Sequence, residues 1–258
     1  MNAVVQKLFT EVPRSIPYRV LEAVLSPESG VRIWIAHLDS ILPNDGRELI
    51  ASLDSGERAR VAQFRFERDR QHFLATRGIL RHLLGAALDI PASALVFEYG
   101  PHGKPAIAGM HGDERTLRFN ISHAAGSAIF ALAWDRNLGI DLEASGHLVS
   151  DPQDLFDLAM CVLSTRELTI WRALPDAARR PAFLRAWTRK EAYVKATGEG
   201  LFDRLQTIEV ALDAAAPQPS LTIRSPSEKE KVGRDWTVHD LPTPDGFVAA
   251  VAVEQVNP

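Results

Sequence analysis

Several short segments of the chain carry the pattern of hydrophobic and polar residues that predicts a β-strand. Their residues are mainly β-branched, aromatic or alternately apolar, and turn-forming residues bound them. The predicted strands are 31–39, 94–100, 138–144, 220–225, 236–241 and 246–253. Residues 117–134 predict a strand, a turn and a second buried apolar segment, whereas the Gly- and Pro-containing stretch 101–107 predicts a loop.

Other regions show the spacing of apolar residues that is typical of helices. Residues 54–88 predict helix in two segments, with leucines at helical spacing near the C-terminal end. Residues 150–163 predict another helix. Residues 1–30 contain turn formers and little periodicity, so we expect a loose N-terminal extension there.

Start and stop signals delimit two more helices. Ser164 and Glu167 have the spacing of a capping box, which predicts that a helix begins at this point. Pro181 is typical of the first turn of a helix, and Gly198 is typical of the position just after the last turn. We therefore expect one helix to open at Ser164 and the next to run from about Pro181 to Gly198.

The order of these elements predicts the fold class. Strands and helices are interleaved without the regular alternation of a doubly wound sheet, which favours an α+β fold. A strand, a long helix and two strands precede residue 138, and a comparable order follows it. The segments "GSAIFALAW" (126–134) and "GFVAAVAV" (246–253) also resemble each other, which suggests a duplicated unit.

Composition and charge exclude several classes of protein. The 258 residues carry a formal net charge of −4, so we expect no general binding to nucleic acid. The single cysteine, Cys161, excludes an internal disulfide framework and is typical of a reducing compartment. No segment approaches the roughly 18 apolar residues of a membrane helix, and the first residues lack a signal-peptide pattern. These features predict a soluble, cytoplasmic protein that does not bind membranes.

The first candidate chemical group is the pair Asp141 and Glu143. Residues i and i+2 of a strand point to the same face, so both carboxylates lie on one side while Leu142 points to the core. Two carboxylates this close repel each other unless a cation lies between them, and oxygen ligands select a hard cation such as Mg²⁺ or Mn²⁺. The alternative is a solvated strand end that happens to carry two acids.

The second group lies in the segment "WTRKEAYVK" (187–195). At helical spacing Trp187, Glu191 and Lys195 share one face, with Lys190 beside it. Glu191 could be a third oxygen ligand or a general base, and Lys195 could neutralise a metal-bound phosphate. The alternative is a surface salt bridge between Glu191 and Lys195. No histidine or cysteine cluster with zinc spacing competes for the site.

The third and fourth groups point to phosphate. Asn120 to His123 end a predicted strand before small residues, so Ser122, His123 and the turn could bind a phosphate. Adjacent strand residues point to opposite faces, which argues against a catalytic Ser122–His123 pair. Seven arginines between residues 58 and 81, together with Lys104, could serve a polyanionic ligand, although most are expected to be solvated. A P-loop and a dinucleotide-binding fingerprint are both absent.

Taken together, four motifs resemble those of one family. "GKP" (103–105), "FNISH" (119–123), "GIDLE" (139–143) and "WTRKEAYVK" stand in the order and at the intervals found in the 4′-phosphopantetheinyl transferases. The chain is similar to the larger, two-lobed (Sfp-type) group over roughly residues 31–255. The resemblance implies two pseudo-symmetric α+β lobes with the active site at their interface. It also implies an N-terminal lobe at 31–137 and a C-terminal lobe at 138–258, after the extension at 1–30.

The resemblance implies a reaction and its partners. The phosphopantetheine arm of coenzyme A moves to a serine hydroxyl of an apo acyl or peptidyl carrier protein, and adenosine 3′,5′-bisphosphate is released. Asp141, Glu143 and Glu191 match the Mg²⁺-binding acids of the family. Glu191 also matches the proposed base, and Lys195 matches the lysine that contacts the pyrophosphate. A monomer with internal pseudo-twofold symmetry is implied.

The remaining motif positions match contacts to coenzyme A. Ser122 and His123 match a phosphate-contacting pair, with His123 near the 3′-phosphate, and Lys104 matches the lysine of the adenine-side loop. Arg60 matches a basic contact to the 3′-phosphate. A second such contact, three residues earlier, is replaced here by Glu57, so that Arg58 or Arg77 could take its place.

Two other classes of function use the same residues. A different Mg²⁺-dependent nucleotide phosphotransferase or pyrophosphatase would need the acids but no carrier protein. A non-catalytic module that binds carrier proteins or coenzyme A would be expected to lack at least one of the three acids, and all three are present.

Overall fold

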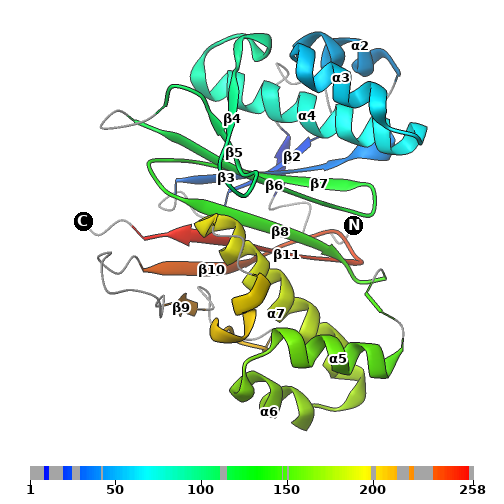
Figure 1. The fold of residues 1–258 in the computed structure, drawn as a ribbon, viewed down its shortest axis with the longest axis vertical. Helices are drawn as coiled ribbons and strands as arrows, with labels where there is room; N and C mark the ends of the chain where they lie inside the picture. Colours follow the sequence, from blue (N-terminus) through cyan, green and yellow to red (C-terminus); the bar gives the residue numbers. More distant parts are fainter. Residues whose placement is uncertain are drawn as a thin grey trace.

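Two β-sheets stack face to face in the middle of the molecule, and helices cover the outer face of each (Figure 1). The computed structural model describes residues 9–11, 20–24, 30–41, 43–110, 115–146, 148–149, 151–198, 202–213, 221–223 and 235–255. The predicted α+β class is confirmed by the mixture of helices and antiparallel sheets.

The first sheet is antiparallel and has the strand order β1-β2-β3-β7-β6. Its strands are β1 (Phe9–Glu11), β2 (Val20–Val24), β3 (Val31–His37), β6 (Leu117–Ala124) and β7 (Ser127–Trp134). Strands β6 and β7 form a hairpin whose turn uses Ala125 and Gly126, both at positive φ. A short 3-10 turn, η2 (Leu38–Ser40), follows β3.

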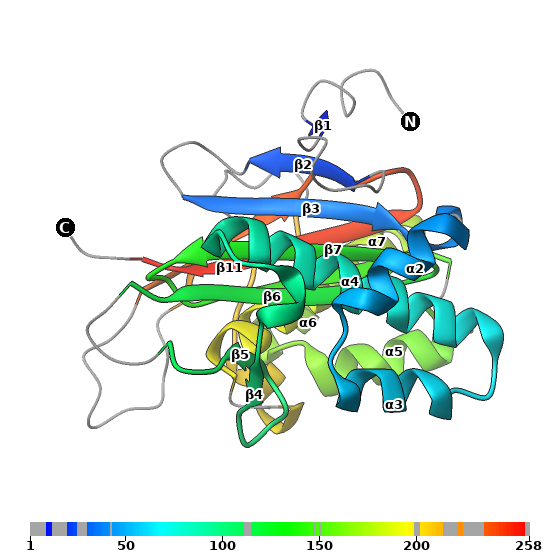
Figure 2. The same ribbon diagram turned by 90° about the horizontal axis from the view of Figure 1, so that it is seen from above.

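Three helices cover the outer face of the first sheet: α2 (Pro43–Ser52), α3 (Ser55–Gln63) and α4 (Glu67–Leu88). Figure 2 shows α4 lying across the sheet, where its apolar face packs against Phe119 and Phe130. Beyond the 3-10 turn η3 (Ala92–Ala94), β4 (Phe97–Tyr99) and β5 (Pro105–Ile107) form a small hairpin. Phe97 fixes this hairpin to the lobe through an edge-to-face contact with Phe119, with ring centroids 5.8 Å apart.

The second sheet is also antiparallel and has the order β8-β11-β10-β9. Its strands are β8 (Leu138–Ala144), β9 (Leu221–Ile223), β10 (Trp236–Leu241) and β11 (Phe247–Glu254). The helices on its outer side are α5 (Pro152–Val162), α6 (Thr165–Ala173), α7 (Asp176–Thr197) and the 3-10 helix η4 (Phe202–Thr207). No helix among the described residues combines the length and apolar character that crossing a membrane requires.

An apolar core between the two sheets joins the lobes. Alternate residues of β3 and β7 point into it from one side, and alternate residues of β8 and β11 point into it from the other. Its strand residues are Val31, Ile33, Ile129, Ala131, Ala133, Leu138, Ile140, Leu142, Ala249, Val251 and Val253. The two similar segments noted in the sequence are β7 and β11, and both supply small and β-branched side chains to this core.

Helix α7 lies directly against β8, and Gly139 permits the close approach. A Cβ atom at residue 139 would lie 2.2 Å from the carbonyl oxygen of Ala192 and 2.2 Å from the amide nitrogen of Ala196. On its other side α7 is fixed by Lys190, whose side chain is fully buried and donates to the Glu167 carboxylate at 2.5 Å. The position of α7 is therefore set from both sides.

Most of the predicted elements are present. Residues 54–88 form two helices, 117–134 form a strand, a turn and a second strand, and 138–144 form β8. The capping box is confirmed, because Ser164 accepts from the Glu167 amide while the Glu167 side chain accepts from the Ser164 amide. Gly198 ends α7 in the left-handed conformation, as expected.

Four local predictions were wrong or incomplete. Helix α7 begins at Asp176, and Pro181 lies inside it, so the proline costs one helical hydrogen bond near the N-terminal end. Residues 1–30 contribute β1 and β2 to the first sheet, so they are more than a loose extension. Part of the predicted loop 101–107 is strand β5. Helix α2 was not predicted, since its segment contains Pro, Asn, Asp and Gly.

A substitution at Gly139 tests the contact between β8 and α7. The added methyl group of Gly139→Ala would meet backbone atoms that cannot move aside, so we expect the free energy of unfolding to fall by about 1–3 kcal/mol or more. Gly146→Ala is the matched control, because a Cβ there would have no heavy atom within 4 Å. Urea unfolding of the two variants provides the measurement, and equal stabilities would contradict the close approach.

Candidate functional site

Strand β8 presents its acidic residues to α7. Leu138, Ile140 and Leu142 point into the core between the sheets, so the intervening Asp141 and Glu143 point to the opposite face. Asp141 is only 3% exposed and Glu143 is half-buried. The predicted placement of both carboxylates on one face, with Leu142 in the core, is confirmed.

Helix α7 brings three side chains to this acidic face. The indole Nε1 of Trp187 donates to Oε1 of Glu143 at 2.9 Å, and Nζ of Lys195 lies 2.5 Å from Oδ1 of Asp141. Glu191 lies between them along the helix and is 8% exposed. Trp187 thus joins α7 to β8 by a hydrogen bond, which the sequence alone did not predict.

The carboxyl group of Glu191 has a strongly perturbed proton affinity. Burial raises its pKa to about 7, the negative charges of Asp141 and Glu143 act in the same direction, and Lys195 opposes the shift. At neutral pH the group is therefore poised between its charged and neutral forms. Perturbed carboxyl groups of this kind are concentrated at functional sites.

Two buried carboxylate oxygens at this site make no hydrogen bond within the described residues: Oδ2 of Asp141 and Oε1 of Glu191. Oxygen donors of this kind fit a hard divalent cation, which would relieve the crowding of negative charge. In the described part of the chain, no group of three or more acidic, histidine or cysteine side chains is already arranged to hold a metal ion. One oxygen of Glu143 is bonded to Trp187 and one of Asp141 to Lys195.

Strand β6 reaches the same cluster from the other lobe. The Ser122 hydroxyl donates to Oδ1 of Asp141 at 3.0 Å and accepts from Nζ of Lys195 at 3.0 Å. Two residues earlier, Oδ1 of Asn120 accepts from the backbone amide of Ile140 at 2.9 Å, which holds β6 beside β8. Both lobes therefore contribute to the site.

His123 lies on the opposite face of β6 from Ser122 and is exposed. This arrangement agrees with the argument against a catalytic pair of these two residues. Desolvation lowers the pKa of His123, and the positive charges of Lys195 and His72 lower it further. His72 in turn lies 2.7 Å from Oδ1 of Asp39, so cationic groups gather around His123. The sequence pattern did not reveal the contribution of His72.

Lys104 joins the two lobes instead of pointing into solvent. Its ammonium group donates to the backbone carbonyls of Lys195 at 2.6 Å, Ala196 at 2.9 Å and Leu138 at 3.2 Å. Burial lowers the pKa of Lys104 to about 8, with a smaller contribution from the charge of Arg118. The lysine of the predicted adenine-side loop is thus engaged by protein atoms.

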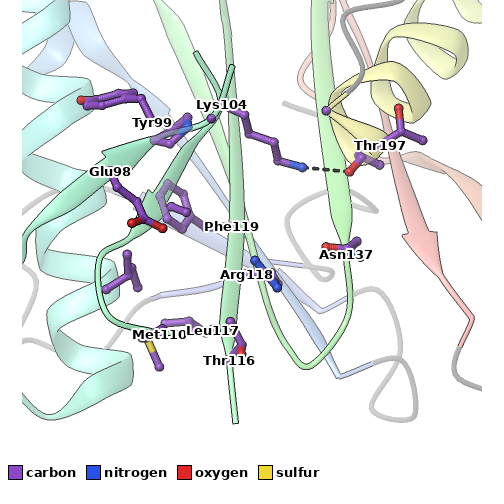
Figure 3. Close-up of a pocket in the computed structure, with 16 residues that line it drawn as sticks. Glu98, Tyr99, Lys104, Met110, Thr116, Leu117, Arg118, Phe119, Asn137 and Thr197 are labelled. Atoms are coloured by element: carbon purple, nitrogen blue, oxygen red, sulfur yellow. Dashed lines mark hydrogen bonds between the residues drawn. The ribbon is translucent and has the colours of Figure 1, made fainter. Parts of the chain in front are cut away.

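Cavities lie on both sides of Lys104. A cavity of about 250 Å³ opens beside Lys195. Its lining comes from the loop after β4, from β6 and from the end of α7: His102, Gly103, Lys104, Pro105, Asn120, Ile121, Val194, Lys195 and Gly198. A second cavity of about 320 Å³ lies on the other side, between the β4–β5 hairpin, the start of β6 and the end of α7 (Figure 3). The first contains the candidate site residues, and the second does not reach the acids.

The arginine-rich region divides into exposed and buried groups. Arg60 is exposed on α3, with its guanidinium carbon 5.1 Å from the ring centre of Phe73. Glu57, the departure from the family pattern, is buried and forms ion pairs with Arg77 at 2.7 Å and Arg81 at 2.6 Å. Glu57 is therefore a structural residue, which explains why a basic side chain is absent there.

The two suggested substitutes for that basic contact are also engaged. Arg58 donates to the carbonyls of Leu53 at 2.9 Å and Ala51 at 3.3 Å. Arg77 is buried against Glu57 and donates to the Tyr99 hydroxyl. Arg60 keeps its place as the exposed candidate on α3.

Comparison with family models gives a consistent match on both lobes. Residues 137–252 match the model described as the 4′-phosphopantetheinyl transferase superfamily. Residues 43–134 match the model described as the N-terminal part of a 4′-phosphopantetheinyl transferase. The two matches together span the described sheets from α2 to β11.

Curated proteins with similar sequences carry related names. The chain is 38% identical over 223 residues to the 4′-phosphopantetheinyl transferase HetI of Nostoc sp., which covers 86% of this chain and 87% of that protein. It is 30% identical over 234 residues to the L-aminoadipate-semialdehyde dehydrogenase-phosphopantetheinyl transferase of Xenopus laevis, covering 87% and 76%. The human protein of the same name is 27% identical over 236 residues, covering 88% and 75%.

The raised pKa of Glu191 predicts a pH dependence of stability. Its folded pKa of about 7 exceeds its ordinary value of 4.5, so the folded state binds the extra proton between these values. Ionisation then opposes folding, and in EDTA we expect the wild type to lose up to about 3 kcal/mol from pH 5 to pH 8 relative to Glu191→Gln. Urea unfolding at each pH measures this, and parallel profiles for the two proteins would contradict the raised pKa. Added Mg²⁺ should reduce the loss if Glu191 binds it.

Proposed function

Because the chain belongs to the 4′-phosphopantetheinyl transferase superfamily, we propose that it transfers the 4′-phosphopantetheine arm of coenzyme A to a serine hydroxyl of an apo carrier protein. The observation that carries the chemistry is the buried carboxyl group of Glu191. Its pKa of about 7 and its unpartnered Oε1 suit a general base that works near neutral pH.

In the proposed reaction, the serine oxygen of the carrier attacks the phosphorus that bears the pantetheine. A new P–O bond forms, and the P–O bond to the bridging pyrophosphate oxygen breaks. Adenosine 3′,5′-bisphosphate departs with the electron pair of that bond, and the Glu191 carboxylate receives the serine proton. Reactions of this class need positioning and neutralisation of charge more than covalent catalysis by the protein.

Lys195 is proposed to neutralise the pyrophosphate. Its ammonium group pairs with Asp141 and Ser122 at the head of the cavity of about 250 Å³, where it can exchange these partners for phosphate oxygens. A cation–carboxylate contact is replaced by a cation–phosphate contact, so the desolvation cost of Lys195 is already met.

Asp141, Glu143 and Glu191 are proposed to hold Mg²⁺ or Mn²⁺. The unpartnered oxygens of Asp141 and Glu191 support this assignment, and Glu143 would supply a further oxygen beside Trp187. When bound, such a cation neutralises charge on the pyrophosphate and on the departing bisphosphate. Trp187 would orient Glu143 in the manner of outer-shell partners at metal sites.

The remaining proposed contacts orient coenzyme A. Ser122 would contact the pyrophosphate beside Lys195, while His123 and Arg60 would contact the 3′-phosphate from the exposed side of the first lobe. The loop with Gly103 at positive φ would bring backbone groups close to the adenine. We further propose that the enzyme is a cytoplasmic monomer, consistent with a single free cysteine and an inter-lobe core filled by its own strands.

The test incubates the purified protein with Mg²⁺, a fluorescent coenzyme A analogue and several apo carrier proteins, and reads each carrier by intact mass. Transfer predicts one added phosphopantetheine group on the carrier serine, and removal of divalent cations with EDTA should abolish it. Glu191→Gln should reduce the single-turnover rate by about 10²–10⁴ while coenzyme A still binds in calorimetry.

Other outcomes of this assay correspond to the two alternative classes of function. Cleavage of coenzyme A without labelling of any carrier would favour a phosphotransferase or pyrophosphatase. Carrier binding without cleavage would favour a non-catalytic module. A wild-type transfer rate in Glu191→Gln would move the proton to another acceptor.

A second prediction concerns the 3′-phosphate of coenzyme A. If His123 contacts it, His123→Ala should weaken catalysis with coenzyme A by roughly 10- to 100-fold, because one charge-assisted hydrogen bond is lost. Catalysis with dephospho-coenzyme A, which lacks the 3′-phosphate, should change little. Steady-state kinetics with both substrates provides the measurement, and equal losses would mean that His123 has only a structural role.

A further inference from the structure

The side chain of Lys104 reaches from the first lobe to the catalytic helix. It starts in the loop between β4 and β5 and crosses to the last turn of α7, as Figure 3 shows with the bond drawn beside Thr197. Its three hydrogen bonds end on Lys195 and Ala196 of α7 and on Leu138 of β8. These acceptors lie 34 to 92 residues from Lys104 in the sequence.

The acceptors explain why a lysine is needed at this position. The last carbonyl groups of a helix have no partner within the helix, and they carry the negative end of the helix dipole. An ammonium group has three donors, and Lys104 directs all three to backbone carbonyls. The stem of Lys104 also passes Gly198, where a Cβ would lie 3.4 Å from Cδ of the lysine.

The same contacts place Lys104 beside the reacting groups. The carbonyl of Lys195 accepts from Lys104 while the Lys195 side chain contacts Asp141, so one residue receives both interactions. Leu138 begins the strand that carries Asp141 and Glu143. A shift of Lys104 would therefore be felt at both the helix and the strand of the site.

We propose that Lys104 is a positioning residue, whose ammonium group ties the loop between β4 and β5 to the end of α7 and so holds Lys195 in register with the bound coenzyme A. This inference rests on the proposed function for its kinetic part. It differs from a direct ligand contact, because the three donors of Lys104 are already used by the protein.

The two roles predict different effects of Lys104→Met. A positioning role predicts that the transfer rate at saturating coenzyme A falls by roughly 10- to 100-fold, since small misplacements of catalytic groups have effects of this size. The dissociation constant of coenzyme A should change less than about threefold, because a ligand contact is not lost. A ligand contact predicts the reverse: weaker binding and an unchanged rate at saturation.

Arg118→Met is the matched control. Arg118 is exposed on β6 and lines the same cavity of about 320 Å³ as Lys104, but it makes none of the bonds to α7 (Figure 3). The control therefore removes one positive charge from the same region without removing the tie. We expect its transfer rate and coenzyme A affinity to remain within about twofold of the wild type, as for an ordinary surface substitution.

Hydrogen exchange gives a readout that does not depend on any catalytic activity. In Lys104→Met, backbone amides at the end of α7, including the Gly198 amide that bonds to Val194, should exchange at least about tenfold faster. The first turns of α7 and the Arg118→Met protein should exchange as in the wild type. Circular dichroism checks folding, and Lys104→Gln, which keeps two donors, replaces Lys104→Met with the same readouts if the latter does not fold.

Faster exchange confined to the end of α7, with a reduced rate and unchanged coenzyme A affinity, supports the proposal. Unchanged exchange overturns it, whatever the kinetics. Weakened coenzyme A binding with an unchanged saturated rate also overturns it in favour of a ligand contact. If the wild type transfers nothing to any carrier, the proposed function fails, and the exchange result still decides whether Lys104 holds α7.

Discussion

The close approach of strand β8 to helix α7 is the contact on which the rest of the site depends. Gly139 leaves room for the helix backbone, and the acids two and four residues later then face the helix instead of solvent. Burial of these carboxylates raises their electrostatic interaction with each other and with Lys195. A wider gap would admit water, and Glu191 would return toward the ordinary behaviour of a glutamate.

The electrostatics of the site are unbalanced in a useful direction. Asp141, Glu143 and Glu191 share one lysine, Lys195, and two of their buried oxygens have no hydrogen-bond partner among the described residues. A fully satisfied network would be more stable but would bind nothing further. The excess of negative charge favours a cation, and the lysine beside it favours an anion. This combination suits a metal-bound phosphate ester.

Local patterns predicted the strands and the acids of this site well, because they depend on near neighbours. Alternation predicted the common face of Asp141 and Glu143, and the capping box and Gly198 marked helix ends correctly. Contacts distant in sequence could not be predicted in this way. The segment of α2 has poor helix propensity, and it is Leu49, packed against Gly78 of α4, that fixes it. Lys104 appeared to be a ligand-side lysine because its acceptors are backbone carbonyls of a distant segment, which carry no signal in the sequence.

The apolar core between the two sheets has a consequence for how substrates enter. Val31, Ile33 and the alternate residues of β7, β8 and β11 are almost fully buried against one another, so hinge-like separation of the lobes would expose the whole of this core to water. The cleft between the lobes therefore cannot open as a jaw. Substrates must be admitted by movement of side chains and loops at the rim, and the enzyme should release its products without a cycle of domain opening and closing.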